Sequence, residues 1–338
     1  MAGTAGRAAL TRGARLFAAK PEMLPAFLLL AVIVGFTAMN SSFLSAVNIS
    51  GMLAYIPEVG LIALGMTMLL TAGQFDLSVG AVFGFTPLVI FIMVNNEHVP
   101  LPAAAVVGLL IAAFIGLVNG VVVTRFGISS FLVTLSTQLI IAGAGLYISN
   151  GFPQATLSVS SWLVRALIGS AFIGGVRVYA SLGWFLLVAG VLWYVLTQSR
   201  LGNWIMATGG NRETAQARGI KTGSIAVGLF ILTSVTAGLA GTISDLRVGS
   251  AYPTAGTGYE LEAIAMAVVG GTSLFGGSGT IIGTVLGAFL LEAIQNGVIL
   301  AGVPGLAYEM FVGAIILIVM ILQVGLRRLP LTGMSKSP

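Results

Sequence analysis

The sequence contains no cysteine and a single histidine, so two common sources of metal-binding and redox chemistry are missing. Without thiols the chain forms no disulfide, no thiolate metal site and no thiol-based redox centre. The one histidine, His98, lies in the polar stretch 95–100, where a solvated loop residue is expected. The remaining candidate ligands show no metal-site spacing, so we expect the chain to hold no metal.

Charged residues are also scarce. They make up 7% of the 338 residues, against 57% apolar residues, whereas a soluble domain carries about 25% charge. A globular protein with so few charged residues cannot cover its surface with groups that interact well with water, so its surroundings must be lipid. Long apolar runs dominate over the ten-residue alternations of a β-barrel. The sequence therefore predicts an all-α integral membrane protein that crosses the bilayer many times.

Ten apolar segments are found, and most reach the roughly 20 residues that cross about 30 Å of hydrocarbon. Two of them are unusual, because 51–73 is interrupted by Pro57 and Glu58, and 261–269 is short. The ten segments are 23–39, 51–73, 77–94, 101–124, 131–148, 179–197, 225–243, 261–269, 281–302 and 306–326.

The first segment, 23–39, has a cleaved signal peptide as its alternative interpretation. It is long for the apolar part of such a peptide, and residues 40–43 offer a poor cleavage site, so we expect a retained first helix. The apolar patch 162–175 is short and carries Arg165. We expect it to be an interfacial or re-entrant piece rather than a further crossing.

The distribution of basic residues tests the count of ten crossings. With the N-terminus inside, only Arg165, Arg177 and Arg247 of the 15 basic residues fall outside. If 261–269 did not cross, the basic tail 327–336 would also lie outside, against the bias. The inside residues are Arg7, Arg12, Arg15, Lys20, Arg125, Arg200, Arg212, Arg218, Lys221, Arg327, Arg328 and Lys336.

This topology divides the chain into three parts, with both termini in the cytoplasm. A transmembrane domain, 23–326, lies between a cytoplasmic tail, 1–22, and a second one, 327–338. The polar loop 198–224 then faces the cytoplasm. The net charge of +5 is small and follows from this topology, so it does not indicate a nucleic-acid partner.

Glycine is abundant, with 46 residues, and many of them form small-xxx-small pairs such as Gly116 and Gly120 that let helices pack closely. Two glycine-rich breaks, 71–80 and 270–280, need another explanation. Non-helical backbone at membrane depth persists only where it is buried in protein or lines a wet cavity, and broken helices are a recurrent device of transporters. The glycines of these breaks are Gly73, Gly80, Gly270, Gly271, Gly276 and Gly277.

The polar stretch 200–221 contains residues that are typical of the beginning and end of a helix. Asn211 is a good N-cap, Glu213 suits the first turn, and Arg218 followed by Gly219 suits the end. About two turns of helix, roughly 212–218, are therefore predicted inside the loop. This short helix is either part of a solvated linker or a surface projection that another protein binds.

No enzyme site emerges from the sequence. The break 270–280 superficially resembles a phosphate-binding loop, but it contains no lysine and no Gly-Lys-Ser/Thr ending. The chain therefore lacks the parts needed to hydrolyse ATP by itself.

Polar residues within the apolar segments are costly, so each needs a role. Glu292, Gln295 and Asn296 share one helix face by their spacing, and that face should point to a cavity or a partner helix. Gln138 and Asn119 are single interior polar residues that suit helix–helix contacts. As polar lining of a solute path we predict Gln138, Gln295 and Asn296, with Asp76 as a mouth residue or helix cap.

Four other carboxylates lie near the outside ends of their predicted segments, where they form either ordinary interface charges or an external vestibule or docking rim. They are Glu58, Glu260, Glu262 and Glu309.

Three stretches occur in register along the chain: Gly-Met-Thr at 65–67 with Asp-Leu-Ser-Val-Gly at 76–80, the glycine-containing loop 207–220, and Glu-Leu-Glu-Ala-Ile-Ala at 260–265 followed by 270–288. Together they resemble the permease subunits of bacterial ABC importers for ribose, xylose and related sugars. The resemblance covers nearly the whole transmembrane part.

The resemblance implies an ABC importer permease fold in the bacterial inner membrane and a second permease, either an identical copy or a paralogue. It also implies a periplasmic binding protein that delivers the solute, and a cytoplasmic ATPase that binds ATP and Mg²⁺, leaving this chain with no cofactor. The predicted ATPase-coupling residues are Gly209, Gly210, Asn211, Glu213, Ala217, Arg218, Gly219 and Ile220.

Other functions remain open at this point. The solute could instead be a branched-chain amino acid or a polyol. An ion-driven secondary transporter would need buried titratable relays, for which Asp76 and Glu292 are the candidates. A structural membrane scaffold is a third possibility, against which the capped loop and the three stretches argue.

Overall fold

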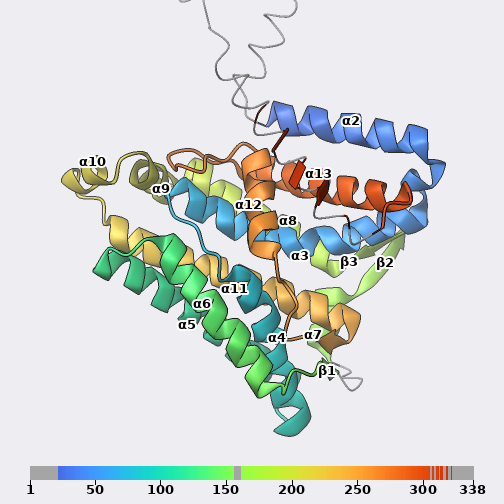
Figure 1. Ribbon diagram of the computed structural model, residues 1–338, viewed down its shortest axis with the longest axis horizontal. Helices are drawn as coiled ribbons and strands as arrows, with labels where there is room; N and C mark the ends of the chain where they lie inside the picture. Colours follow the sequence, from blue (N-terminus) through green and yellow to red (C-terminus); the bar gives the residue numbers. More distant parts are fainter. Residues whose placement is uncertain are drawn as a thin grey trace, which may run out of the picture.

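The computed structural model describes residues 22–155 and 161–304, together with 307, 310–311, 313–314, 317–318 and 321. This part of the chain is a helix bundle, as predicted (Figure 1). Seven of its helices are long and apolar enough to cross a membrane. They are α3 (Ala46–Thr71), α4 (Val79–Asn96), α5 (Leu101–Phe126), α6 (Ser130–Ile148), α8 (Ala180–Gln198), α11 (Thr222–Val248) and α13 (Ile281–Leu300).

Two further predicted segments are shorter helices, α2 (Met23–Met39) and α12 (Tyr259–Val269). The tenth segment, 306–326, lies largely outside the described residues, as do nearly all of the tail 1–22 and the whole tail 327–338, so ten crossings remain a prediction. The remaining helices are η1 (Ser41–Leu44), α7 (Trp162–Ile168), α9 (Arg200–Gly210) and α10 (Arg212–Ala217).

Two small sheets correct the all-α prediction. Strands β2 (Ser170–Ile173) and β3 (Val176–Tyr179) form an antiparallel hairpin, whose turn uses Gly174 and Gly175 at positive φ. The stretch 162–175, predicted as one interfacial or re-entrant piece, is thus helix α7 followed by this hairpin. A shorter pair joins β1 (Gln154–Ala155) to β4 (Ser250–Ala251).

Helix α3 is the centre of the bundle, and every residue from Ile56 to Thr71 is buried. It packs against α8, α11, α12 and α13. Pro57 and Glu58, which interrupt the apolar run in the sequence, both lie inside α3, and the helix continues through them. Within the buried half, the hydroxyls of Thr67 and Thr284 are 2.6 Å apart and join α3 to α13.

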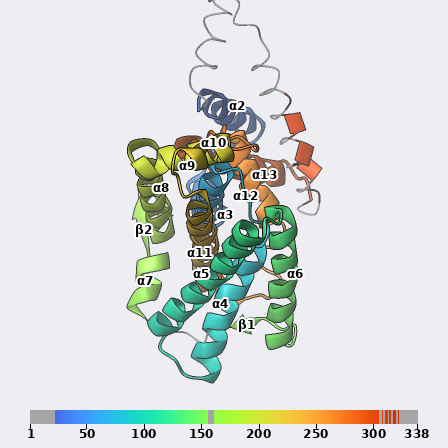
Figure 2. The same cartoon turned by 90° about the vertical axis from the view of Figure 1, so that its left-hand side faces the viewer.

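The flanks of the bundle are apolar and exposed, as lipid-facing surfaces should be. Figure 2 shows α6 and α8 on opposite flanks, with α3 and α11 between them. On α5, Val106, Leu110 and Phe114 recur every fourth residue and are 59%, 63% and 63% exposed. This spacing places them on one face of the helix, turned away from the core.

Helix α11 packs closely because glycines line its contacts. A Cβ on Gly241 would overlap the carbonyl oxygen of Phe83 on α4, and a Cβ on Gly238 would lie 2.9 Å from the Thr86 hydroxyl. Gly228, on the same helix, has no atom within 4 Å of the corresponding position. The small residues of α11 therefore differ in what they contribute to packing.

We expect Gly241→Ala to lower the free energy of unfolding by about 1–3 kcal/mol, because backbone cannot yield as a side chain can. Gly228→Ala is the matched control, and it should keep or slightly raise stability because alanine favours helix by about 1 kcal/mol. Thermal unfolding in detergent measures both variants. Equal midpoints for the two would contradict the close α4–α11 contact.

Candidate functional site

The predicted helix in the polar loop is present as α10. Asn211 caps it, accepting a hydrogen bond at 2.8 Å from the backbone N–H of Thr214. At the other end, Gly219 adopts a φ of 81° and Ile220 donates to the carbonyl of Ala215 at 3.1 Å, which closes the helix as a Schellman motif. Ala215 is the buried residue of α10, and Figure 1 shows the helix projecting from the edge of the bundle.

Helix α9 precedes α10 and corrects the prediction for residues 200–210, which were expected to lie in a loop. Ser199 caps it by accepting from the N–H of Gly202 at 3.2 Å. The signal was present, because Leu201, Trp204 and Ile205 have helical spacing after a serine cap. Asn211 ends α9 and begins α10, so no linker separates the two helices.

The two glycine-rich breaks meet the end of α9 in a contact made by backbone, which we call the glycine junction: Gly73, Gly209, Gly276 and Gly277. A Cβ on Gly209 would overlap the carbonyl oxygen of Thr71 and lie 2.7 Å from the nitrogen of Gly277. A Cβ on Gly276 would lie 2.7 Å from the oxygen of Gly209 and 2.9 Å from the Cα of Gly73. The predicted break glycines and the predicted coupling residue Gly209 thus meet in one place.

Hydrogen bonds fix the breaks at the junction. Gly73 ends α3 in a Schellman motif, with Gln74 donating to Leu69 at 3.1 Å. The last free carbonyl of α3, that of Thr71, accepts from Gly277 at 2.9 Å. Gly73 and Gly277 have φ of 76° and 80°, a region that favours glycine.

The other predicted break glycines lie where helices touch. Gly271 closes α12 with a φ of 103°. A Cβ on Gly270 would lie 2.6 Å from the nitrogen of Thr284 on α13, and one on Gly80 would meet the carboxylate of Glu260. These glycines hold the broken segments close together.

A charged cluster lies in the part of the bundle away from α10. Glu58 of α3 is 3% exposed and accepts from Ser244 at 2.9 Å. Its other oxygen forms an ion pair with Arg247 of α11, whose Nε donates at 3.0 Å. The Arg247 guanidinium also stacks 4.3 Å from the ring centre of Tyr55.

Further carboxylates surround this ion pair. Glu292 of α13 lies within electrostatic range of Glu262, Glu58 and Arg247, and Asp245 lies within range of Glu58. Each of these four carboxylates, from four different helices, therefore lies within electrostatic range of at least one other. Charge inside a membrane costs about 2.5–3.5 kcal/mol per group, so such a cluster indicates a function.

Comparison with known proteins identifies the family. Residues 48–320 match the family described as the branched-chain amino acid transport system permease component. The chain belongs to this permease family. The ribose import permease of Escherichia coli strain K12 is 36% identical over 295 residues, which cover 87% of this chain and 90% of the relative.

Two other relatives are similar to this permease. The D-allose transport system permease of the same E. coli strain is 36% identical over 80% of this chain and 82% of its own. The xylose/arabinose import permease of Sulfolobus acidocaldarius is 33% identical over 84% of this chain and 79% of its own length. No solved structure matches the permease.

The role of this permease is transport rather than catalysis, and it is a multi-pass protein of the inner membrane. Its family membership and its apolar helices agree on this point.

Asp76 of the permease is fully buried between α3 and α4. Its Oδ1 accepts from the backbone N–H of Ser78 at 2.8 Å and from the Ser78 hydroxyl at 2.5 Å. Asn119 donates to the same hydroxyl at 3.0 Å and accepts from Thr137 at 2.6 Å. Asp76 thus orders the turn before α4 and joins α4, α5 and α6, rather than facing an open path in this state.

The other predicted path residues are half-buried and lie apart. Gln138 of α6 donates to Glu260 at 2.9 Å, and Asn296 of α13 accepts from Asn48 of α3 at 2.7 Å. Gln295 lies beside Asn296 on α13. The structure brings Gln295 and Asn296 together on one helix, but not with Gln138.

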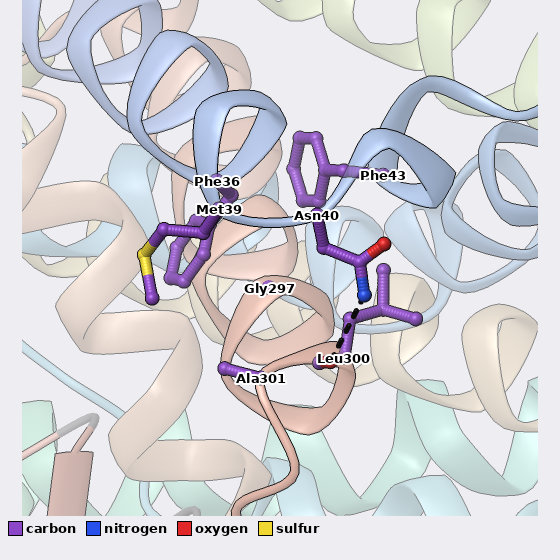
Figure 3. A pocket seen from close by; sticks show the side chains of 7 residues that line it. All are labelled: Phe36, Met39, Asn40, Phe43, Gly297, Leu300 and Ala301. Carbon is purple, nitrogen blue, oxygen red and sulfur yellow. Dashed lines mark hydrogen bonds between the residues drawn. The ribbon is translucent and has the colours of Figure 1, made fainter.

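A cavity of about 220 Å³ lies between α2, η1 and α13 (Figure 3). The Asn40 amide donates to the carbonyl of Leu300 at 3.2 Å, so its polar side chain is already engaged. Six of its seven lining residues are apolar. The lining residues are Phe36, Met39, Asn40, Phe43, Gly297, Leu300 and Ala301.

Proposed function

We propose that this permease is the membrane subunit of an ATP-driven importer for a sugar or sugar-like solute: a pentose, a hexose or a polyol. The observation that carries the proposal is the similarity to permeases named for ribose, D-allose and xylose/arabinose, which extends over at least 80% of the chain. The structure adds an exposed, capped helix, α10, in a chain without ATP-binding sequence elements.

In this proposal a cytoplasmic ATPase, which binds ATP and Mg²⁺, also binds α10 of the permease. The chain crosses the membrane ten times with both termini inside, which the distribution of basic residues supports. The coupling residues Gly209 to Ile220 then face the cytoplasm. ATP binding and hydrolysis would tilt the helices on either side of α10 and switch the path between its two openings.

The solute path would run between this permease and a second one, and a periplasmic binding protein would deliver the solute. The cluster around Glu58 and Glu292 would face the outer part of that path. A weakly lined path is expected, because a transporter must release its solute while the binding protein supplies affinity. Gln295 and Asn296 extend the same face of α13 as Glu292.

Reconstitution tests the proposal. Proteoliposomes containing the permease, its ATPase and its binding protein should take up a labelled sugar from a pentose, hexose and polyol panel. Uptake should stop when ATP is depleted and continue when a protonophore is added. Uptake that stops with the protonophore but not with ATP depletion would instead support an ion-driven transporter.

A branched-chain amino acid is the second candidate solute, because it gives the matching family its description. The charged cluster does not exclude it, because an amino acid is a zwitterion. Arg247 is already paired with Glu58, but the surrounding carboxylates would suit the ammonium group of an amino acid. Competition of leucine against the sugar panel in the same proteoliposomes separates these candidates.

A further inference from the structure

We infer that Gly209 passes the movement of the α9–α10 unit directly to the ends of α3 and α12, through the backbone contacts of the glycine junction. The inference rests on the proposed function, because it requires that an ATPase moves α10. It goes further by naming the contact that carries the movement into the membrane part of the permease.

The first step is the rigidity of the α9–α10 unit. Asn211 donates its N–H to the Ala207 carbonyl of α9 at 3.1 Å, and its side chain caps α10 at Thr214. One residue thus closes one helix and opens the next. A force on α10 therefore displaces the end of α9, where Gly209 lies.

The second step is the nature of the contact at Gly209. The residue meets Thr71, Ala72 and Gly277 through main-chain atoms, with 2.9 Å between an added Cβ and the carbonyl carbon of Ala72. Side-chain contacts can absorb a displacement by changing rotamer, but backbone contacts cannot. When α9 moves, the end of α3 and the loop after α12 must move with it or the contact must break.

The third step is what lies beyond the junction. Helix α3 is continuous from its C-terminal residue Thr71 back to Glu58, about 20 Å away at 1.5 Å per residue. Glu58 belongs to the charged cluster, to which α12 and α13 contribute Glu262 and Glu292. Movement at the junction thus reaches the cluster along elements that are already helical and packed.

Gly190 provides a control outside the predicted coupling residues. A Cβ at Gly190 would have no atom within 4 Å, whereas one at Gly209 would overlap Thr71. Gly190 lies on α8, the helix before α9. Gly209→Ala and Gly190→Ala therefore make the same chemical change, but only Gly209→Ala disturbs the junction.

The experiment measures sugar molecules imported per ATP hydrolysed, in proteoliposomes with the ATPase and the binding protein. We expect Gly209→Ala to keep ATPase association and hydrolysis while imported sugar per ATP falls about tenfold. Gly190→Ala should match the wild type. A wild-type ratio in Gly209→Ala overturns the inference. Wild-type uptake that does not depend on ATP would instead overturn the proposed function.

A second pair of variants decides the matter if Gly209→Ala does not fold. A Cβ on Gly279 would overlap the hydroxyl of Thr71, and the remaining contact with the Thr71 Cβ is 3.3 Å. Gly279→Ala should therefore lower the ratio, and the double variant Gly279→Ala/Thr71→Ala should restore it. Loss in both the single and the double variant, or in neither, overturns the inference.

Discussion

An Arg247→Leu permease is expected to lose about 3–5 kcal/mol of folding free energy, because the substitution leaves the Glu58 carboxylate buried without its cation. Glu58 is 3% exposed, and the Arg247 side chain is 15% exposed. Ser244 would remain as a partner for one oxygen of Glu58, but a single hydroxyl does not balance a charge. Thermal unfolding in detergent, followed with purified protein, measures the loss.

The double variant Glu58→Gln/Arg247→Leu separates the ion pair from simple loss of packing. A neutral glutamine still accepts from Ser244 and needs no cation, so most of the lost stability should return. Arg165→Leu is the control for removing an arginine, since Arg165 is exposed on α7 and should change stability by no more than about 0.5 kcal/mol. If Arg247→Leu were as mild as Arg165→Leu, the buried pair would not exist.

The ion pair also bears on transport, because it joins α3 to α11 in the part of α3 away from the glycine junction. Helix α3 is thus held at its middle, by charge at Glu58, and at its C-terminal end, by backbone contact at Thr71. A variant that breaks the ion pair should alter imported sugar per ATP even where the protein remains folded.

The helical segments were predictable from sequence because lipid imposes a strong rule. A spanning segment must satisfy its own backbone hydrogen bonds and present apolar side chains for about 20 residues. The predicted run 23–39 is helix α2, and the predicted runs 131–148 and 281–302 correspond to α6 and α13 within two residues. Helix α10 was equally accessible, since Asn211 and Gly219 are local signals.

The site could not be assembled in the same way. Glu58 and Arg247 are 189 residues apart, and nothing in their spacing indicates a pair. The glycine junction joins residues near 73, 209 and 277, each of which reads locally as a turn or helix end. Helix α9 was hidden because its two final glycines resemble a loop. Such contacts follow from packing of distant elements, which local patterns do not encode.

Reversing the charges of Glu213, in the first turn of α10, and Arg218, its C-cap, is expected to give the largest functional loss. In Glu213→Arg/Arg218→Glu, the exposed face that would meet the ATPase carries reversed charges. Each new side chain would then face ATPase residues of its own charge sign, because those residues complement the original side chains. Like charges in an interface cost several kcal/mol, so affinity for the ATPase should fall about 100-fold or more. Co-purification with the ATPase and ATP-driven sugar uptake should both be lost.

Glu97→Lys supplies the control, since Glu97 is exposed at the end of α4, in a loop predicted to face the opposite side of the membrane. It should retain both co-purification and uptake. The reversal at Glu213 also weakens the first turn of α10, where a negative charge suits the helix dipole. Glu213→Gln removes that stabilisation without reversing the charge, so it should lose little affinity. If the double reversal kept both ATPase co-purification and sugar uptake, α10 would not be the docking helix. No movement of the ATPase would then reach the glycine junction through α10.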